Sequence, residues 1–495
     1  MRYLHELLDA RAASRPGRSA VSGGGHGRAA GPVTYERLRE RALQLAREVI
    51  RPAAAPGDRV LILAGNHADT VAAFFACSYA DTVAVVVHPK IRLFHLRHIA
   101  RDCDAVLALC DEELATTARA ADVPAHVLQE PPQPGPTPGT PSAEEARRSP
   151  EEPACLIYTS GSTGMPKGVI SPHRQMLFAV GAIGSQLGYA ADDTVFSCLP
   201  LSFDYGLYQA LLCAAAGAHL VLGGDESAGP ALARRLEETG ATVFPLVPHL
   251  AATLVRLMDR SGRAPSRLRL VTNTGAALPG PTVEALRRHL PGLDVRPMYG
   301  LTECKRVSVP EPDAWRTRPG SVGRPLPGTA CRIADETGRT VPAGSAGELV
   351  VSGPHVMPGY WNAPDLTARR FRPDGRGGVE LYTGDLCRID EEGHLYFLGR
   401  GDDVYKAGGF RVSTLEVEAA ALDIAGVEAA AVLRPDGGHP ARLFAVGAVT
   451  GDELRAGLAE RLEPAKIPPV CVVVDRMPLT PHGKPDRQAL GAWYE

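Results

Sequence analysis

Residues 154–170 read ACLIYTSGSTGMPKGVI, an apolar strand followed by a loop of glycines and hydroxyl residues. The loop consists of Thr159, Ser160, Gly161, Ser162, Thr163 and Gly164. Backbone N–H groups and hydroxyls in such a loop can surround phosphate oxygens, and Lys167 behind it can neutralise one of them. A flexible Ser/Gly linker would not normally lie between two apolar runs, so the stretch predicts a phosphate-binding loop. Its spacing differs from GxxxxGK[ST], and an ordinary P-loop nucleotidase is therefore not indicated.

The chain on both sides of this loop alternates strand-like with helix-like segments. Strands are predicted at 59–63, 83–87, 105–109, 154–158, 194–199, 219–222, 242–247 and 269–272. Helices are predicted between them, for example at 68–79, 93–102 and 230–239. Such alternation predicts an α/β fold with doubly wound parallel sheets. The Pro-rich stretch 129–153 is interpreted as an exposed connection.

The pattern of predicted strands and helices changes twice in the second half of the chain. After Gly320, short strands and turns predict a small β-barrel-like subdomain. From about Gly401, a new strand and helix pattern predicts a small α+β domain. We therefore expect two units, residues 1–400 and residues 401–495.

Composition excludes several classes of function. The 495 residues carry a formal net charge of −3, which argues against the basic domain typical of nucleic-acid binding. No apolar run reaches the roughly 18 residues of a membrane span, and no signal-peptide pattern opens the chain, so a cytoplasmic protein is expected. The ten cysteines form no CxxC pair and are interpreted as reduced thiols.

Lysine is rare among the 53 basic residues. The six lysines are Lys90, Lys167, Lys305, Lys406, Lys466 and Lys484. Lysine and arginine are not interchangeable, because an ammonium group is a compact point charge with three donors. A lysine that remains in such a chain and lies within a motif is a candidate for function.

The TSGSTGMPKG segment resembles the phosphate loop of the adenylate-forming superfamily. That superfamily contains acyl-CoA ligases, aryl ligases and the adenylation domains of nonribosomal peptide synthetases. Further segments resemble its other signatures in the same order: TYERL at 34–38, YGLTE at 299–303, YTGD at 382–385, GRGD at 399–402 and GKPDR at 483–487. One match would be weak, but the ordered series is specific and covers almost the whole chain.

The resemblance implies a site for ATP and Mg²⁺. Ser160, Thr163 and Lys167 would hold the β- and γ-phosphates, Thr302 the α-phosphate, and Glu303 the metal. The adenine would lie against Tyr299 and Gly300, beside Gly275, Ala276 and Ala277. Asp385 would accept both ribose hydroxyls, with Arg400 nearby. These roles suit the side chains, because a carboxylate is a good acceptor for a diol and an oxygen ligand for a hard cation.

The resemblance implies that residues 1–400 form the adenylation core, which binds ATP and substrate, and that residues 401–495 form a mobile domain that carries the catalytic lysine. Lys484 would contact the substrate carboxylate and the α-phosphate during adenylate formation, by positioning and electrostatic stabilisation. Asp402 would be the hinge about which the small domain rotates between two half-reactions. Lys406, Gly408 and Gly409 would then line a tunnel for the thiol acceptor, although a Gly-Gly pair is also typical of a hairpin turn.

The expected acid is small. Asp204 aligns with the aspartate that binds the substrate ammonium in amino-acid-activating domains, which favours an amino acid. The other candidate lining residues are Tyr208, Leu246, Thr274, Met298, Lys305 and Arg306. Two alternatives stay open at this point: Asp204 pairs with Arg306 as a structural ion pair, or Lys305 or Arg306 binds a second carboxylate or polar group of the substrate.

The acceptor is predicted from two conflicting segments. GKPDR resembles enzymes that load a carrier protein, whereas GRGDDVYKAGGFRVS at 399–413 resembles acyl-CoA ligases. No carrier motif is evident, so we expect transfer to phosphopantetheine on a separate carrier protein. The alternatives are an acyl- or aryl-CoA ligase that uses free coenzyme A, and a non-catalytic nucleotide-binding relative.

Overall fold

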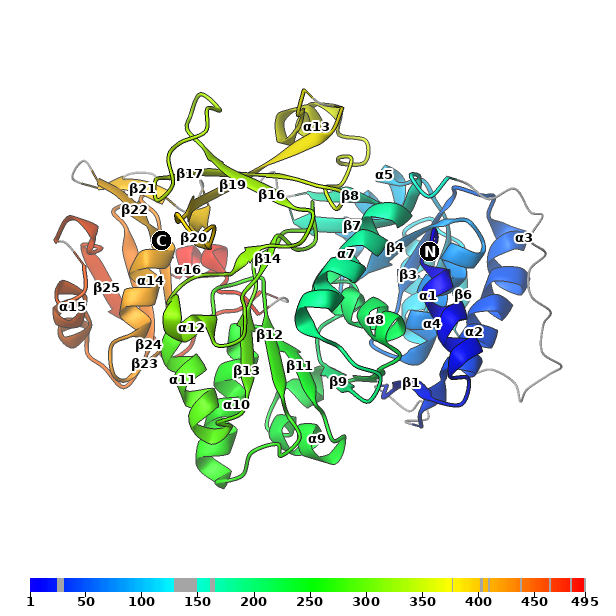
Figure 1. Cartoon of the computed structure of the whole chain (residues 1–495), viewed down its shortest axis with the longest axis horizontal. Helices are drawn as coiled ribbons and strands as arrows, with labels where there is room; N and C mark the ends of the chain where they lie inside the picture. The colour runs from blue at the N-terminus through cyan, green and yellow to red at the C-terminus, as the bar shows by residue number, and fades with distance from the viewer. Residues whose placement is uncertain are drawn as a thin grey trace.

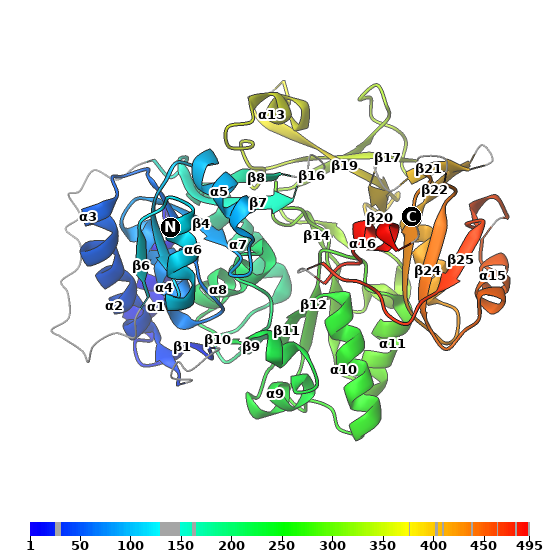
Figure 2. The ribbon, with the colours of Figure 1, turned by 180° about the vertical axis from the view of Figure 1, so that it is seen from behind.

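Figures 1 and 2 show the protein, a computed structural model, from opposite sides. The described residues are 1–24, 31–128, 149–160, 165–375, 377–400, 404–407, 410–436, 439–462, 464–480 and 483–493. The amino-terminal helices lie at one end of the molecule and the carboxyl-terminal elements at the other (Figure 1).

The first sheet carries the hydroxyl-rich loop. Its strand order is β6 (Ala125–Val127), β5 (Ala105–Cys110), β3 (Arg59–Leu63), β4 (Val83–Val87), β7 (Pro153–Ser160), β8 (Pro166–Pro172). Neighbours are parallel except for β7 and β8, which form an antiparallel hairpin. Its crossover helices are α4 (Ala68–Tyr79), α5 (Leu93–Asp102) and α6 (Ala115–Ala120). The predicted parallel sheet is confirmed here.

The second sheet has seven strands. Their order is β13 (Asp294–Pro297), β12 (Leu270–Asn273), β11 (Val243–Leu246), β9 (Thr194–Ser197), β10 (His219–Leu222), β1 (Ser19–Ser22), β2 (Val33–Thr34). The helices connected with it are α1 (His5–Ser14), α2 (Tyr35–Gln44), α7 (His173–Leu187), α8 (Asp204–Ala216), α9 (Leu232–Glu238), α10 (Pro248–Ser261) and α11 (Gly280–His289). Only β2 runs antiparallel to its neighbour.

One apolar core joins the two sheets. Val60 and Ile62 of β3 belong to the same buried cluster as β9, β10, α4 and α8, whereas Leu61 and Leu63 belong to a second cluster with α5 and α6. Successive side chains of a strand point to opposite faces, so a strand buried on both faces is apolar throughout. This is why polar and apolar residues do not alternate over 59–63.

A smaller sheet follows residue 320, as the short strands and turns in the sequence predicted. β19 (Val379–Ile389) pairs antiparallel with β17 (Ala346–Ser352), β18 (Phe371–Pro373) and β20 (Leu395–Arg400), and β16 (Ala330–Ala334) pairs with β17. The helix α13 (Pro364–Arg370) precedes β18. Short pieces nearby are β14 (Ser308–Val309), β15 (Arg324–Pro325) and α12 (Ala314–Thr317).

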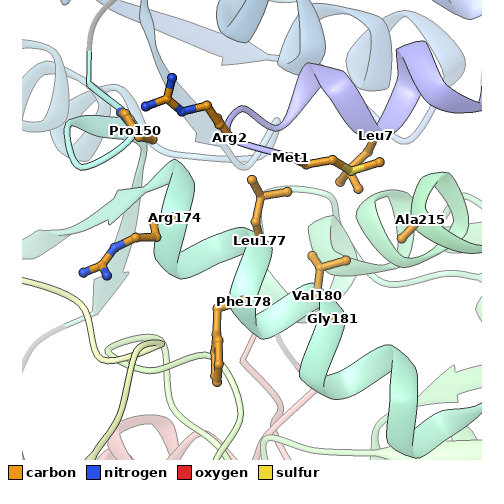
Figure 3. A pocket seen from close by; sticks show the side chains of 10 residues that line it. All are labelled: Met1, Arg2, Leu7, Pro150, Arg174, Leu177, Phe178, Val180, Gly181 and Ala215. Carbon is orange, nitrogen blue, oxygen red and sulfur yellow. The ribbon is translucent and has the colours of Figure 1, made fainter. Parts of the chain in front are cut away.

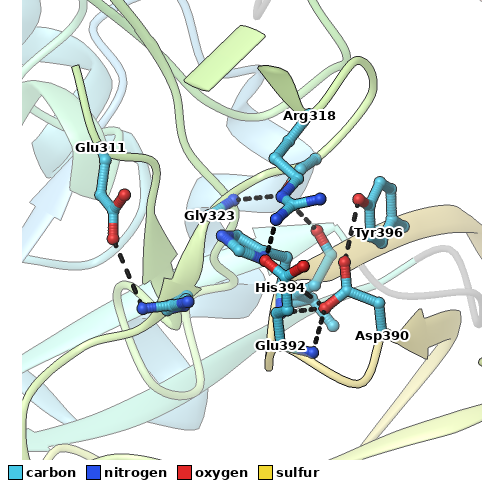
Figure 4. A network of polar contacts seen from close by, with 10 residues as sticks. Glu311, Arg318, Gly323, Asp390, Glu392, His394 and Tyr396 are labelled. Atoms are coloured by element: carbon cyan, nitrogen blue, oxygen red, sulfur yellow. Dashed lines mark hydrogen bonds and ion pairs between the residues drawn. The ribbon is translucent and has the colours of Figure 1, made fainter. Parts of the chain in front are cut away.

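Polar contacts hold the β19–β20 turn against the segment before β15 (Figure 4). Arg318 pairs with Glu392, and Asp390 accepts hydrogen bonds from the backbone of His394 and from the hydroxyl of Tyr396. The hairpin that carries Asp385 is thereby joined to the polypeptide that follows the YGLTE motif.

The carboxyl-terminal residues form their own sheet and core. The hairpin β21 (Val404–Ala407) and β22 (Phe410–Ser413) precedes the sheet β23 (Val427–Leu433), β24 (Arg442–Gly447), β25 (Val470–Val473). Its helices are α14 (Thr414–Leu422), α15 (Gly451–Ala459) and α16 (Arg487–Ala492). A separate cluster that includes Val417, Leu443 and Leu454 fills this unit. The predicted boundary at 400/401 adjoins residues 401–403, which lie outside the described residues, and it stays a prediction.

The described residues include no helix that is long and apolar enough to cross a membrane. All ten cysteines lie within the described residues, and none of them forms a disulfide.

Candidate functional site

The β7–β8 hairpin presents the predicted phosphate loop. Thr159 lies opposite Lys167 in its ladder. Gly161, Ser162, Thr163 and Gly164 lie outside the described residues, as does the side chain of Ser160. Lys167 is therefore a residue of strand β8, where the sheet fixes its backbone close to the loop.

Lys167, Tyr360 and Glu303 meet beside this hairpin. The Lys167 Nζ donates to the Tyr360 hydroxyl at 3.3 Å and lies 3.9 Å from Glu303 Oε1. The Tyr360 hydroxyl donates to the same carboxylate oxygen at 2.5 Å, and the ammonium lies 4.4 Å from the centre of the tyrosine ring. The cluster joins a cation suited to phosphate with a carboxylate suited to a metal ion.

Sequence reasoning missed Tyr360. Its segment pairs with strand β8, about 190 residues earlier in the chain, and this pairing brings Tyr360 to Lys167. Trp361 N–H donates to the Gly168 carbonyl at 2.8 Å, and Ile170 N–H donates to the Gly359 carbonyl at 3.0 Å. The segment 359–361 therefore lies along the outer edge of β8. The aromatic pair in PGYWN at 358–362 was the available signal, but a local pattern does not reveal such a distant partner.

Tyr299 and Asp385 are also brought together. The Tyr299 hydroxyl donates to Asp385 Oδ2, and both residues are buried. The Tyr299 ring stacks on Phe397 with centroids 5.4 Å apart. Burial and the neighbouring carboxylate raise the pKa of Tyr299 well above its usual value, which keeps it a donor. Asp385 lies opposite Arg400 in the β19–β20 ladder, although the Arg400 side chain lies outside the described residues.

The YGLTE turn folds back tightly on the residues after it. A Cβ on Gly300 would lie 2.4 Å from the Lys305 carbonyl oxygen, so no larger residue fits this close approach. Thr302 is half-buried in the turn, and Cys304 N–H donates to the Leu301 carbonyl at 3.0 Å. The turn thus places Glu303 toward Lys167.

Lys484 reaches the exposed NTGAA segment that follows β12. Gly275, Ala276 and Ala277 are exposed there, and the Lys484 Cε lies 3.9 Å from the position a Cβ would take on Gly275. The arrangement brings a lysine from the carboxyl-terminal unit to the edge of the second sheet, and its catalytic role stays a prediction.

Close packing holds the lysine loop. Gly483 has φ +73°, and a Cβ there would lie 2.3 Å from the imidazole of His249 in α10. Within the loop, Thr480 N–H donates to the Lys484 carbonyl at 2.7 Å, and Gly483 N–H donates to the Thr480 carbonyl at 2.9 Å. His249, which sequence reasoning missed, is therefore a contact between the two units.

The residues predicted to bind the acid gather around the start of α8. Asp204 is the first residue of α8 and is half-buried, while Lys305 and Arg306 are 3% and 4% exposed. Lys305 Nζ donates to the Ser171 hydroxyl at 3.0 Å, and Arg306 Nη1 donates to the Thr274 hydroxyl at 2.5 Å. In the described part of the chain, Asp204 makes no ion pair with Arg306.

Burial and mutual charge shift the pKa values of Asp204, Lys305 and Arg306. Burial raises the pKa of Asp204, and the charges of Lys305 and Arg306 oppose that rise. Burial lowers the pKa of Lys305 and of Arg306, and Asp204 opposes both changes. The three charges therefore share one enclosed region.

The apolar candidates differ in position. Tyr208 lies one helical turn after Asp204, and its buried hydroxyl has no hydrogen-bond partner. Leu246 and Met298 belong to the main core cluster beside Thr274. The roles of Asp402, Gly408, Gly409 and the Lys406 side chain stay predictions, because these lie outside the described residues.

The residues present fit ATP and Mg²⁺. Lys167 and the loop donors suit phosphate, and Asp385 in its buried position suits a ribose diol. The described residues hold no cluster of three or more metal-ligating side chains. Mg²⁺ is usually held by one or two carboxylates together with substrate phosphates and waters, so Glu303 alone suits it.

A pocket on the described surface lies away from these residues. A pocket of about 570 Å³ is open between the amino-terminal segment and α7 (Figure 3). Leu177 points from α7 toward Met1, and Leu7 and Phe178 also line the pocket. None of the predicted site residues lines this pocket.

Comparisons with known proteins give a family match for the chain. The family described as AMP-binding enzyme matches residues 8–361. The chain is 32% identical to the L-proline--[L-prolyl-carrier protein] ligase of Streptomyces coelicolor, over 93% of this chain and 92% of that protein. It is 34% identical to phosphinothricin tripeptide synthetase PhsC of Streptomyces viridochromogenes, of which it spans 45%.

A solved structure is also similar. VinN in complex with L-aspartate superposes with a TM-score of 0.70 at 38% identity, over 80% of this chain and 98% of that one.

Proposed function

Because the chain belongs to the AMP-binding enzyme family, we propose that it is an AMP-forming ligase that activates a small amino acid and transfers it to a thiol. The observation that carries this proposal is the approach of Lys484 to Gly275, at the edge of the sheet that also positions Asp204 and Thr274. A lysine there can stabilise charge that develops between a carboxylate and a phosphate.

The first half-reaction uses the groups already described. The substrate carboxylate attacks the α-phosphorus of ATP, and pyrophosphate leaves. Lys167 neutralises the leaving phosphates, Glu303 holds the metal, and Lys484 steadies the attacking carboxylate and the α-phosphate. Bound Mg²⁺ supplies charge neutralisation for the phosphate oxygens. Tyr299 and Asp385 orient the nucleoside.

The second half-reaction is proposed by analogy with the relatives. The carrier-protein ligase of Streptomyces coelicolor supports a phosphopantetheine thiol on a separate carrier as the acceptor. The thiol attacks the acyl carbonyl, AMP leaves, and a thioester forms. The segment 399–413 favours coenzyme A as the alternative acceptor. Asp204 and the complex of VinN with L-aspartate support an amino acid over an amine-free acid.

The test is pyrophosphate exchange into ATP with a panel of amino, aryl and short acyl acids. We expect exchange that requires an acid and Mg²⁺ and that Lys484→Ala reduces by at least about 100-fold, because the lysine acts on the transition state. Exchange without an acid, or undiminished exchange in Lys484→Ala, would contradict the proposal.

A thiol panel then separates the acceptors. Thioester formation on a phosphopantetheinylated carrier, without product on free coenzyme A, supports the carrier. The reverse result supports the CoA ligase. Nucleotide binding without either half-reaction would indicate a non-catalytic relative.

A further inference from the structure

Two buried cations beside Asp204 are not used by the adenylation step. Lys305 and Arg306 are both more than 95% buried, and neither makes an ion pair with any residue of the described chain. A buried charge without a counter-charge is unfavourable, and buried charges in proteins are normally paired, so a bound anion that supplied the opposite charge would stabilise these two.

The neighbouring carboxylates do not balance these cations. Glu303 lies 3.9 Å from Lys167 and is assigned to the metal. That leaves Asp204, one carboxylate against two cations. If Asp204 accepts a substrate ammonium, as the proposed function holds, both cations lack a counter-charge.

The hydrogen-bond donors here are also only partly used. Arg306 donates through Nη1 to Thr274, but its buried Nε has no partner. Lys305 has three N–H donors, and Ser171 accepts one of them. The buried Tyr208 hydroxyl also lacks a partner.

The backbone holds both cations in place. Lys305 has φ +63°, a conformation that few non-glycine residues adopt, and Arg306 N–H donates to the Cys304 carbonyl at 2.7 Å. The Arg306 guanidinium lies over the Tyr205 ring, 5.3 Å from its centre. A strained turn that sends two adjacent cations inward is typical of a binding site.

We propose that Lys305 and Arg306 form an anion subsite for a second carboxylate of the substrate, and that the activated acid is an amino dicarboxylic acid. Asp204 binds its ammonium, the subsite binds one carboxylate, and the other carboxylate meets ATP near Lys484. This inference rests on the proposed function and names its substrate class. A guanidinium and an ammonium together can bind both oxygens of a carboxylate.

The test compares acids of matched shape in the pyrophosphate-exchange assay with the full chain. Aspartate and glutamate carry both groups, asparagine replaces the second carboxylate by an amide, succinate lacks the ammonium, and alanine lacks the side-chain carboxylate. We expect kcat/KM for the preferred amino dicarboxylic acid to exceed that for asparagine by at least about 100-fold, because a polar site rejects an analogue that leaves its buried groups unpaired.

Two variants test whether Lys305 and Arg306 cause the preference for the dicarboxylic acid. Arg306→Leu and Lys305→Met should each lower kcat/KM for the dicarboxylic acid by about tenfold or more and reduce the preference for that acid over asparagine. Melting temperatures check that the variants fold, and the wild-type panel decides the proposal even if they do not.

The outcomes separate the two levels of proposal. Asparagine or alanine equal to the dicarboxylic amino acids would overturn the subsite and leave the proposed function standing. Succinate equal to aspartate would overturn the ammonium role of Asp204 and thus the amino dicarboxylic class. Acid-independent exchange, or none with any acid, would overturn the proposed function and this inference with it.

Discussion

At the scale of single residues, the Tyr360 hydroxyl connects the two charged groups of the phosphate site. It accepts from Lys167 at 3.3 Å and donates to Glu303 at 2.5 Å. A hydrogen bond to a charged group is stronger than one between neutral groups. Tyr360 therefore positions the carboxylate proposed to hold Mg²⁺ and the ammonium proposed to hold phosphate.

Tyr360→Phe should slow pyrophosphate exchange about tenfold, because a hydrogen bond to a charged group contributes roughly 1.5–3 kcal/mol. The Mg²⁺ concentration for half-maximal exchange should rise as well, which a purely structural role would not cause. Tyr396→Phe is the matched control, since Tyr396 donates to Asp390 at 3.1 Å away from the site. Equal effects of the two variants would contradict the positioning role.

At the scale of elements, helix α10 supports the loop of the catalytic lysine. His249 in its first turn packs against Gly483, immediately before Lys484. Burial lowers the pKa of His249, so the imidazole is neutral when the two units meet. A neutral ring can pack against a glycine without a desolvated charge.

Gly483→Ala should reduce adenylation by about 100-fold, because the new Cβ would meet His249 and push Lys484 away from its target. Adding His249→Ala should restore part of the loss, since it removes the clash while the strain at φ +73° remains. Gly262→Ala is the control: Gly262 follows the same helix at φ +64° with open space around it. Pyrophosphate exchange is measured for the wild type and the three variants. If the double variant recovers no activity relative to Gly483→Ala, the steric explanation is wrong.

At the scale of the whole molecule, weak contacts join the carboxyl-terminal unit to the rest. Arg256 of α10 lies 3.5 Å from Glu428 of β23, and both side chains are 58% exposed. Exposed ion pairs contribute only about 0–1 kcal/mol, so this contact does not oppose a rotation of the small unit. The proposed role of Lys484 in adenylation corresponds to this arrangement, in which Lys484 lies at Gly275.

Asp402→Pro should spare adenylate formation and impair thioester formation, because proline restricts the backbone at the predicted hinge. Asp402→Ala, which keeps the backbone free, should retain both half-reactions. Pyrophosphate exchange and single-turnover transfer to the thiol measure the two steps separately. Parallel loss of both in Asp402→Pro would count against the hinge.

Much of the fold was predictable from the sequence, because its signals are local. Strands buried on both faces appear as unbroken apolar runs, so β3 and β4 occupy the predicted residues. The long strand β19 is indicated by the sequence only over its last residues, 386–389, because Gly384 and Asp385, two residue types that are rare in strands, interrupt the pattern before them. Motif order likewise indicated the family before any contact was known.

The sequence by itself determined which groups are proposed to carry the chemistry: the lysines at 167 and 484, the carboxylates at 303 and 385, and the loop that joins β7 and β8. Only the tertiary structure decided their neighbours. It placed Tyr360 on Glu303 and His249 on Gly483, and it left Lys305 and Arg306 buried beside Asp204 without an ion pair. The physical reason is that motifs record local backbone and side-chain chemistry, whereas charge balance and contact depend on which distant segments pack together.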